Sequence, residues 1–240
     1  MITLASFNHD FGQIRIQRNR RSGDVTFVQG GCYQSRCDIL GVSIVSYIHA
    51  LFHLVLRAQA RSVLMIGCGG GSLATLLKKN GVDVTIVDIN PLSIDIARQH
   101  FGLPAAIECH IADGADFLAL CSRQFDAIVM DAYCGAVIPR HLRDAAFFRL
   151  AKSCLPDDAG VILANLHLID DDDSTAREYA NVARQSWPVV RMLDAPRAVY
   201  RNAIVLAGDV STLRAPSMVE MPLTNIAPIT DELSKLRFVR

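Results

Sequence analysis

The sequence predicts an α/β protein with a doubly wound, mostly parallel sheet and a small N-terminal β-hairpin appendage. Two observations predict the sheet. Apolar runs of strand length alternate with helix-length segments after residue 44, and a glycine-rich turn at 67–72 follows the first run. Short alternating runs and turn residues in the first 43 positions predict the appendage. We therefore expect two parts, residues 1–43 and residues 44–240.

The appendage is expected to contain a hairpin. Residues 14–17 alternate between apolar and polar, residues 25–28 resume β character, and a polar segment with Gly23 separates them. Three arginines, at 18, 20 and 21, lie at the expected tip. They could form an anion-binding patch, but a solvated turn is the simpler interpretation.

The α/β domain is expected to begin with a largely buried helix at 44–56, where most positions are apolar. Strands and helices then alternate, with strands at 62–66, 83–87, 107–111, 125–130, 160–166, 189–193 and 203–207 and helices at 72–79, 91–100, 115–120, 144–154 and 174–184. Asn90 and Pro91 open one helix and Gly102 ends it. The tail at 215–228 is proline-spaced and extended, and a short helix opens at Thr230.

Composition limits the function classes. The 24 basic and 24 acidic side chains cancel, which argues against a nucleic-acid partner bound through a basic surface. No apolar run reaches the roughly 18 residues of a membrane span, and the N-terminus lacks the layout of a signal peptide. Seven scattered cysteines favour reduced thiols, and Cys32 and Cys37 lack the second close pair of a zinc site. We expect a cytoplasmic protein without metal or membrane partners.

The glycine-rich turn brings the backbone close to a ligand. Gly67, Gly69 and Gly71 end the first strand and open a helix, where missing side chains let N–H groups approach a bound molecule. The dinucleotide fingerprint G-x-G-x-x-G would place its third glycine at Ser72. This spacing disfavours a nicotinamide oxidoreductase.

Acidic residues follow three successive strands. Asp88 lies seventeen residues after Gly71, where a carboxylate can bind ribose hydroxyls, and Asp113 could meet an adenine amino group. Asp131 ends the fourth strand. Ordinary helix N-caps explain any one of these acids better than all three together. The combined pattern resembles the class I S-adenosylmethionine-dependent methyltransferase fold, which is Rossmann-like.

A closer resemblance covers residues 10–207. The segments GCYQ at 31–34, VDIN at 87–90, ADG at 112–114 and FDAIVMDAYCG at 125–135 are similar to the polyamine aminopropyltransferase, or spermidine synthase, family. DAYCGAVIPRHL, AAFFRLAKSCL and GVILANL resemble its bacterial spermidine-synthase-like subgroup. The resemblance implies polyamine chemistry, an appendage that covers the active site and, in many members, a homodimer.

The resemblance also implies residue roles. It places Gln34 near the nucleoside, Asp88 and Ile89 at the ribose, and Asp113 and Gly114 at the adenine. Asp131 matches the base that takes a proton from the attacking amine, and Tyr47 matches a tyrosine of the same pocket. The nucleoside is S-adenosylmethionine or its decarboxylated form.

Two departures argue against ordinary spermidine synthesis. Gly70 replaces the acid of the family's G-G-G-D-G-G loop, and Cys134 and Gly135 replace the second acid and the proline of D-S-x-D-P. A buried ammonium group without a carboxylate partner costs several kcal/mol, on the order of magnitude usual for such groups. Without the loop acid, intact S-adenosylmethionine becomes an admissible donor.

We therefore expect a transferase that moves an aminopropyl or methyl group to a small amine-type acceptor, with Asp131 as general base. A nucleoside-binding pseudoenzyme or regulatory module is the alternative. Three features stay open. His49 and His53 could be a second base or part of a metal site, or simply packed. Cys134 could be a nucleophile or a neutral replacement. The acidic run at 171–173 could bind metal or compensate a helix end.

Overall fold

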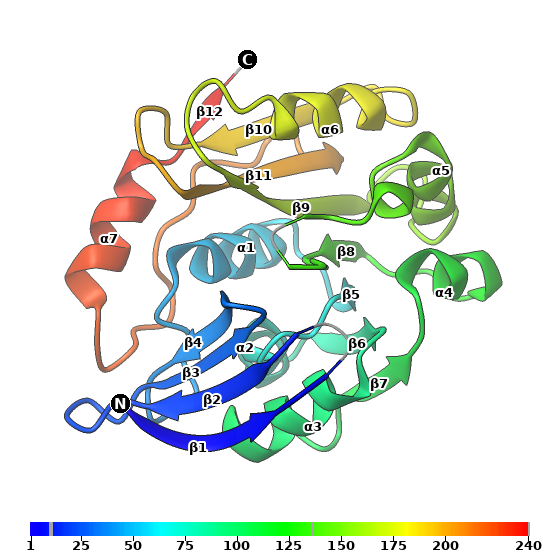
Figure 1. The fold of residues 1–240 in the computed structure, drawn as a ribbon. Coiled ribbons are helices and arrows are strands. Elements are labelled where there is room, and N and C mark those ends of the chain that lie inside the picture. Colours follow the sequence, from blue (N-terminus) through cyan, green and yellow to red (C-terminus); the bar gives the residue numbers. More distant parts are fainter. Residues whose placement is uncertain (10–11, 136, 240) are drawn as a thin grey trace.

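The structure, a computed structural model, describes residues 1–9, 12–135 and 137–239. It contains a four-stranded sheet in the order β1-β2-β3-β4 and an eight-stranded sheet in the order β12-β10-β11-β9-β8-β5-β6-β7 (Figure 1). Helices cover both faces of the larger sheet. The predicted α/β class with a mostly parallel sheet and a small N-terminal β unit is confirmed.

The N-terminal unit is larger than the predicted hairpin. The expected pair is present, and two further strands make the sheet fully antiparallel: β1 (Ile2–Phe7), β2 (Ile14–Arg18), β3 (Val25–Gln29) and β4 (Cys32–Cys37). β1 escaped prediction because its residues are mostly exposed and give no burial alternation. β4 contains a register shift opposite Phe27 and Val28.

The larger sheet has a parallel centre and an antiparallel edge. The parallel strands are β5 (Ser62–Ile66), β6 (Asp83–Asp88), β7 (Glu108–Ile111), β8 (Ala127–Met130) and β9 (Val161–Leu168). The antiparallel pairings involve β10 (Val190–Asp194), β11 (Arg201–Gly208) and β12 (Arg237–Val239). The carboxyl ends of the parallel strands therefore meet at one edge, where such sheets bind ligands.

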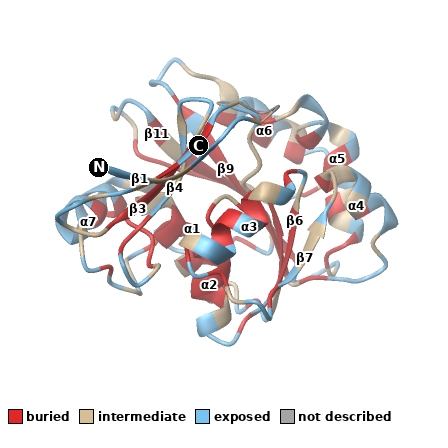
Figure 2. Ribbon diagram, turned by 60° about the horizontal axis from the view of Figure 1, so that its bottom comes forward, coloured by how far each residue is buried: buried red, intermediate tan, exposed pale blue. Residues whose placement is uncertain are grey.

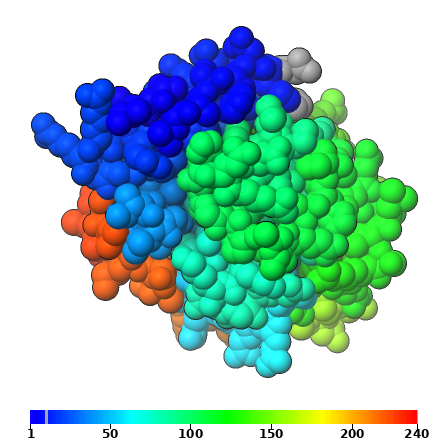
Figure 3. Space-filling view, turned by 90° about the horizontal axis from the view of Figure 1, so that it is seen from below, coloured from blue at the N-terminus to red at the C-terminus, as the bar shows by residue number. Residues whose placement is uncertain are grey.

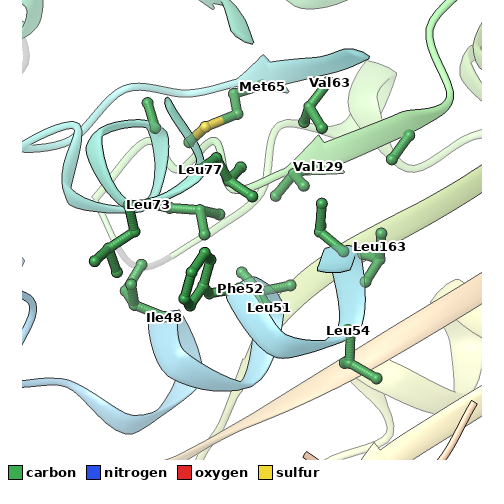
Figure 4. Packing of buried hydrophobic residues seen from close by; sticks show 14 of the residues in the cluster. Ile48, Leu51, Phe52, Leu54, Val63, Met65, Leu73, Leu77, Val129 and Leu163 are labelled. Carbon is green, nitrogen blue, oxygen red and sulfur yellow. The ribbon is translucent and has the colours of Figure 1, made fainter. Parts of the chain in front are cut away.

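Two hydrophobic clusters hold the helices to opposite faces of this sheet. One contains side chains of α1 (Ser46–Arg57), α2 (Ser72–Lys79), α3 (Pro91–His100) and α7 (Ile226–Lys235). The other contains side chains of α4 (Gly114–Leu120), α5 (Ala145–Ser153) and α6 (Thr175–Ala183). Figure 4 shows α1 and α2 meeting β5, β8 and β9 in the first cluster, and Figure 2 shows buried residues both in the strands of the larger sheet and in helices such as α2 and α3.

The small sheet packs on α3. A third cluster joins the buried face of the sheet, including Ile14, Ile16 and Phe27, to Ile96 and Phe101. In Figure 3 the blue residues of this sheet lie directly against the green segment around α3. The sheet is thus attached beside the ligand-binding edge rather than at the far end of the domain.

The tail differs from its prediction. The last helix, α7, begins at Ile226 instead of Thr230, and the chain ends in the unpredicted strand β12. The reason lies in Pro228, which we expected to precede the helix. Pro228 occupies the first helical turn, where its missing N–H would have no helical partner in any case. No helix in the described ranges is both long and apolar enough to cross a membrane.

Candidate active site

A cavity of about 600 Å³ opens at the carboxyl edge of the parallel strands. Its walls come from the ends of β5, β6, β8 and β9, from the first turn of α1 and from β4 of the small sheet. This volume is typical of a site for one or two small molecules. The predicted residues that line it are Gln34, Tyr47, Gly67, Gly69, Asp88, Ile89, Asp113, Gly114 and Asp131.

The glycine turn brings two of its three predicted glycines to the cavity. Gly67, Gly69 and Gly71 all have positive φ, at 97°, 50° and 69°. A Cβ on Gly67 would lie 2.3 Å from the Asp131 carbonyl oxygen, so the close approach of these strand ends requires glycine. Gly71 does not line the cavity, and it packs against Leu103 at the start of α2.

Asp88 lies at the end of β6 and helps to hold the glycine turn. Its carboxylate accepts hydrogen bonds from the backbone N–H of Cys68 at 2.7 Å and of Asn90 at 2.8 Å. Burial raises the pKa of Asp88, and these two hydrogen bonds oppose that effect. The next side chain, Ile89, is 57% exposed and contributes an apolar surface to the mouth of the cavity.

Asp113 serves as a helix cap. One carboxylate oxygen accepts hydrogen bonds from the N–H groups of Ala115 and Asp116 and so caps α4. The other lies 2.7 Å from Nε2 of His141. Burial tends to raise the pKa of Asp113, but the hydrogen bonds from His141 and the helix outweigh it and lower the pKa. Gly114 is confined by Ile66, which a Cβ would approach to 2.4 Å.

Asp131 accepts hydrogen bonds from two side chains of the cavity. Its Oδ1 accepts a hydrogen bond from Asn165 Nδ2 at 2.8 Å, and its Oδ2 accepts one from the Tyr47 hydroxyl at 3.2 Å. Burial raises the pKa of the Asp131 carboxyl, and both hydrogen bonds oppose this. Burial and the neighbouring Asp131 also raise the pKa of Tyr47, which keeps its hydroxyl as a donor.

Several polar residues of the cavity were not predicted from the sequence. Asn165 on β9 accepts a hydrogen bond from Asn202 of β11 at 2.9 Å, so an amide pair supports Asp131 from behind. His167 and Tyr200 stack at the rim with ring centroids 6.4 Å apart. The segment GVILANL had indicated only a strand, and the asparagine that interrupts its apolar run was the available signal.

Comparisons with known proteins agree with this geometry. The methyltransferase domain family matches residues 63–157. A polyamine aminopropyltransferase of Neisseria meningitidis is 34% identical over 173 residues, and one of Chromobacterium violaceum is 31% identical over 172 residues. Each match covers 68% of this chain but 63% of the relative, so the chain spans slightly less than two thirds of their length.

A solved structure shows the same fold. A probable spermidine synthase from Corynebacterium glutamicum superposes on 98% of this chain and 89% of its own, with a TM-score of 0.78 and 16% identity. The chain is spermidine-synthase-like and has the class I methyltransferase fold.

Two positions of this spermidine-synthase-like chain depart from the acids of the family's motifs, Gly70 and Cys134. Gly70 does not line the cavity: its N–H donates to Ser35 Oγ at 2.7 Å, and a Cβ there would lie 2.8 Å from both Ser35 and Phe101. Cys134 does line it, as an exposed free thiol whose backbone exchanges hydrogen bonds with Val137. Gly70 therefore contributes no side chain to the cavity, whereas Cys134 contributes a thiol where the family has an acid.

The two histidines of α1, His49 and His53, do not line the cavity. His49 is fully buried, its Nε2 lies 2.8 Å from the Ser43 carbonyl, and burial lowers the pKa of its ring. His53 contacts Ser217 instead. The two rings therefore do not converge on a shared ligand, which favours the packed interpretation over a second base.

The acidic run at 171–173 has structural partners. Asp171 accepts hydrogen bonds from the Arg197 N–H and pairs with Arg201, and Asp173 accepts them from the N–H groups of Thr175 and Ile169. These contacts favour the helix-end interpretation. Among the residues that the structure describes, no group of three His, Cys, Asp or Glu side chains could hold a metal ion.

Proposed function

We propose that this protein is a transferase that binds S-adenosylmethionine or its decarboxylated form and moves a methyl or aminopropyl group to an amine-type acceptor. The observation that carries the proposal is Asp131, a carboxylate with a raised pKa held between Asn165 and Tyr47 on the cavity wall. It adjoins Gly67, where the absent side chain leaves the backbone open to a ligand. A buried carboxyl of this kind suits a general base.

The cavity residues support a division of labour. Asp88 would accept hydrogen bonds from ribose hydroxyls, Asp113 would bind the adenine amino group, and Gln34 and Ile89 would flank the nucleoside. Both oxygens of Asp88 accept backbone hydrogen bonds, and those of Asp113 contact the start of α4 and His141, so each acid would bind the nucleoside through a remaining lone pair. A carboxylate offers about four lone-pair sites, so an additional partner is admissible.

The proposed reaction is a direct displacement. The acceptor nitrogen attacks the carbon bonded to the sulfonium sulfur, the carbon–sulfur bond breaks with its electron pair on sulfur, and a neutral thioether leaves. Asp131 takes the proton that the new ammonium releases. The protein contributes mainly alignment and exclusion of water, which together account for several kcal/mol, roughly, in such reactions.

Both chemistries have support in the relatives. The relatives include polyamine aminopropyltransferases and methyltransferases, and the matching domain family is a methyltransferase family. We propose an amine acceptor because the buried Asp131 carboxylate on the cavity wall can take the proton that an attacking amine releases. Spermidine synthesis of the ordinary kind is disfavoured, since Cys134 offers no carboxylate to a second ammonium group. A homodimer and a cytoplasmic location also remain proposals.

The test of the proposed function combines binding and turnover. Asp131→Asn keeps the shape of the cavity and removes the base. We expect nucleoside affinity, measured by calorimetry with methylthioadenosine, to change less than about threefold, and turnover to fall by about 10²–10⁴-fold. Products are detected by mass spectrometry with a mixture of amine acceptors.

A matched control and two contrary outcomes make the test decisive. Asp116→Asn changes an exposed carboxylate on α4 that does not line the cavity, and it should leave both quantities unchanged. Nucleoside binding without any product would support the alternative, a binding module without catalysis. Turnover that survives in Asp131→Asn would show that another group is the base.

A further inference from the structure

The cavity contains one permanent cation. Arg36 of β4 is the single Arg or Lys side chain among the described residues that line it. The acids that line it come from other elements: Asp88, Asp113 and Asp131 end β6, β7 and β8 or follow them. A guanidinium group is charged at every accessible pH and prefers carboxylate or phosphate partners.

The fold directs Arg36 to one end of the cavity. The register shift in β4 places two residues opposite one on β3, so Tyr33 pairs with Val28 while Arg36 pairs with Thr26. Both side chains therefore share a face of the sheet, and the guanidinium lies 5.9 Å from the centre of the Tyr33 ring. The carbonyl of Arg36 also accepts a hydrogen bond from the Ile44 N–H, just before the helix that carries Tyr47.

Arg36 has no acidic partner within the described part of the chain. No ion pair joins it to another described residue. The nearest acid along the chain, Asp38, uses both oxygens on the N–H groups of Leu40, Val42 and Leu223. An arginine that lines a cavity without a carboxylate partner is available to an anionic ligand group.

The glycine turn opposite carries no negative charge that could balance Arg36. Gly70 is packed against Ser35 and Phe101, so a side chain at this position cannot enter the cavity without displacing the small sheet. Cys68 is buried, and burial together with the neighbouring Asp88 raises the pKa of its thiol. Asp88, which accepts a hydrogen bond from the Cys68 N–H, is therefore the acid that adjoins this turn, and Arg36 is the cation of the β4 wall.

We propose that Arg36 binds the carboxylate of the donor, and hence that the donor is intact S-adenosylmethionine rather than its decarboxylated form. This inference rests on the proposed function. In this proposal the nucleoside lies along β6 with the sulfonium beside Asp131, and the remaining chain on sulfur reaches the β4 wall of the same cavity, which carries Arg36. Intact donor presents a carboxylate there, whereas the decarboxylated chain ends in an ammonium group that Arg36 repels.

Calorimetric titrations without any acceptor test this proposal. The ligands are S-adenosylmethionine, S-adenosylhomocysteine, decarboxylated S-adenosylmethionine and methylthioadenosine, which lacks the amino-acid end. We expect the wild-type protein to bind the two carboxylate-bearing ligands at least about tenfold more tightly than the decarboxylated form. Arg36→Gln should weaken those two ligands by about tenfold or more and change methylthioadenosine by less than about threefold.

Two further variants separate charge from structure. Arg36→Lys keeps the charge and should retain part of the preference. Arg15→Gln removes an exposed arginine from β2 of the same sheet that does not line the cavity, and it should change nothing. Because no acceptor is present, a carboxylate on the acceptor cannot produce the expected pattern.

Each contrary result has a distinct meaning. Wild-type preference for the decarboxylated donor, or Arg36→Gln with unchanged affinity for S-adenosylhomocysteine, would overturn the role of Arg36 while leaving the proposed function intact. Equal weakening of all four ligands would show that Arg36 only supports the fold of the site, and it would overturn the proposal as well. If the wild-type protein binds none of the four, the proposed function itself is wrong.

Discussion

At the scale of single residues, Asn165 lowers the proton affinity of the proposed base, against the larger effect of burial. Its amide donates to Asp131, and this hydrogen bond opposes the effect of burial on the Asp131 pKa. Asn165→Ala should therefore raise that pKa further. Because a carboxyl acts as a base only when ionised, the acid limb of the kcat/KM profile should move to higher pH, by about one unit.

The pH profile distinguishes this role from a purely structural one. A structural defect would lower kcat/KM at every pH without moving the limb. Asn202→Ala is the matched control, since Asn202 contacts Asn165 rather than the carboxylate and should shift the limb much less. An unchanged limb in Asn165→Ala would mean that the titrating base is not Asp131.

The sequence indicated which side chains line the cavity better than it indicated which of them bind one another. Asp131 and Tyr47 were selected from strand-end position and resemblance, and the structure joins them by a hydrogen bond. Asn165 was not selected, because its contact with Asp131 depends on how β9 lies beside β8. Nothing within the segment GVILANL specifies that pairing.

At the scale of elements, Arg201 ties the antiparallel edge of the sheet to the loop after β9. It donates to both oxygens of Asp194, at 2.7 and 3.0 Å, and lies 3.0 Å from Asp171. The Arg201 and Asp194 side chains are only 8% and 9% exposed. Arg201→Met would leave a buried carboxylate without its partner, and unfolding free energy should fall by about 3–5 kcal/mol.

Urea denaturation followed by circular dichroism measures this loss. The slope with urea concentration should stay the same while the midpoint falls. Lys235→Met removes an exposed ion pair with Asp231 within α7 and should cost less than about 1 kcal/mol. If the two variants lose equal stability, the buried pair contributes no more than a surface one.

Element prediction succeeded where local signals agree. The strand at 62–66 and the helices at 72–79 and 91–100 match the structure residue for residue. Strong apolar periodicity and the Asn90 cap, which accepts from the Leu92 N–H, account for this agreement. β12 was missed because its three residues form a strand only through pairing with β10.

At the scale of the whole molecule, the small sheet depends on the larger domain. Its own buried cluster is completed by Ile96 and Phe101 at α3, and its strand β4 forms one wall of the cavity. The predicted boundary at residue 43 marks the change from alternating strand-like runs to a helix. Nothing in that pattern reveals that the small sheet and the larger domain share the buried cluster at α3. The position of the appendage over the strand ends came from resemblance alone, because it depends on long-range packing.

This dependence predicts that a bound nucleoside stabilises the small sheet. With its limited core, the sheet should open locally before the larger sheet unfolds, and opening removes a wall of the ligand site. Methylthioadenosine at about 100 times its Kd should therefore slow amide hydrogen exchange in β3 and β4, by up to about 100-fold. Mass spectrometry of peptides that cover residues 25–37 measures the effect.

The helix α6 provides the internal reference, since it contacts neither the cavity nor the small sheet. Its exchange should not change, because the ligand stabilises it only against global unfolding. If the ligand slows exchange at residues 66–90 but not at residues 25–37, the small sheet opens without releasing the ligand. In that case β4 borders the cavity but does not hold the nucleoside, and the donor would be recognised by the strand ends of the larger sheet alone.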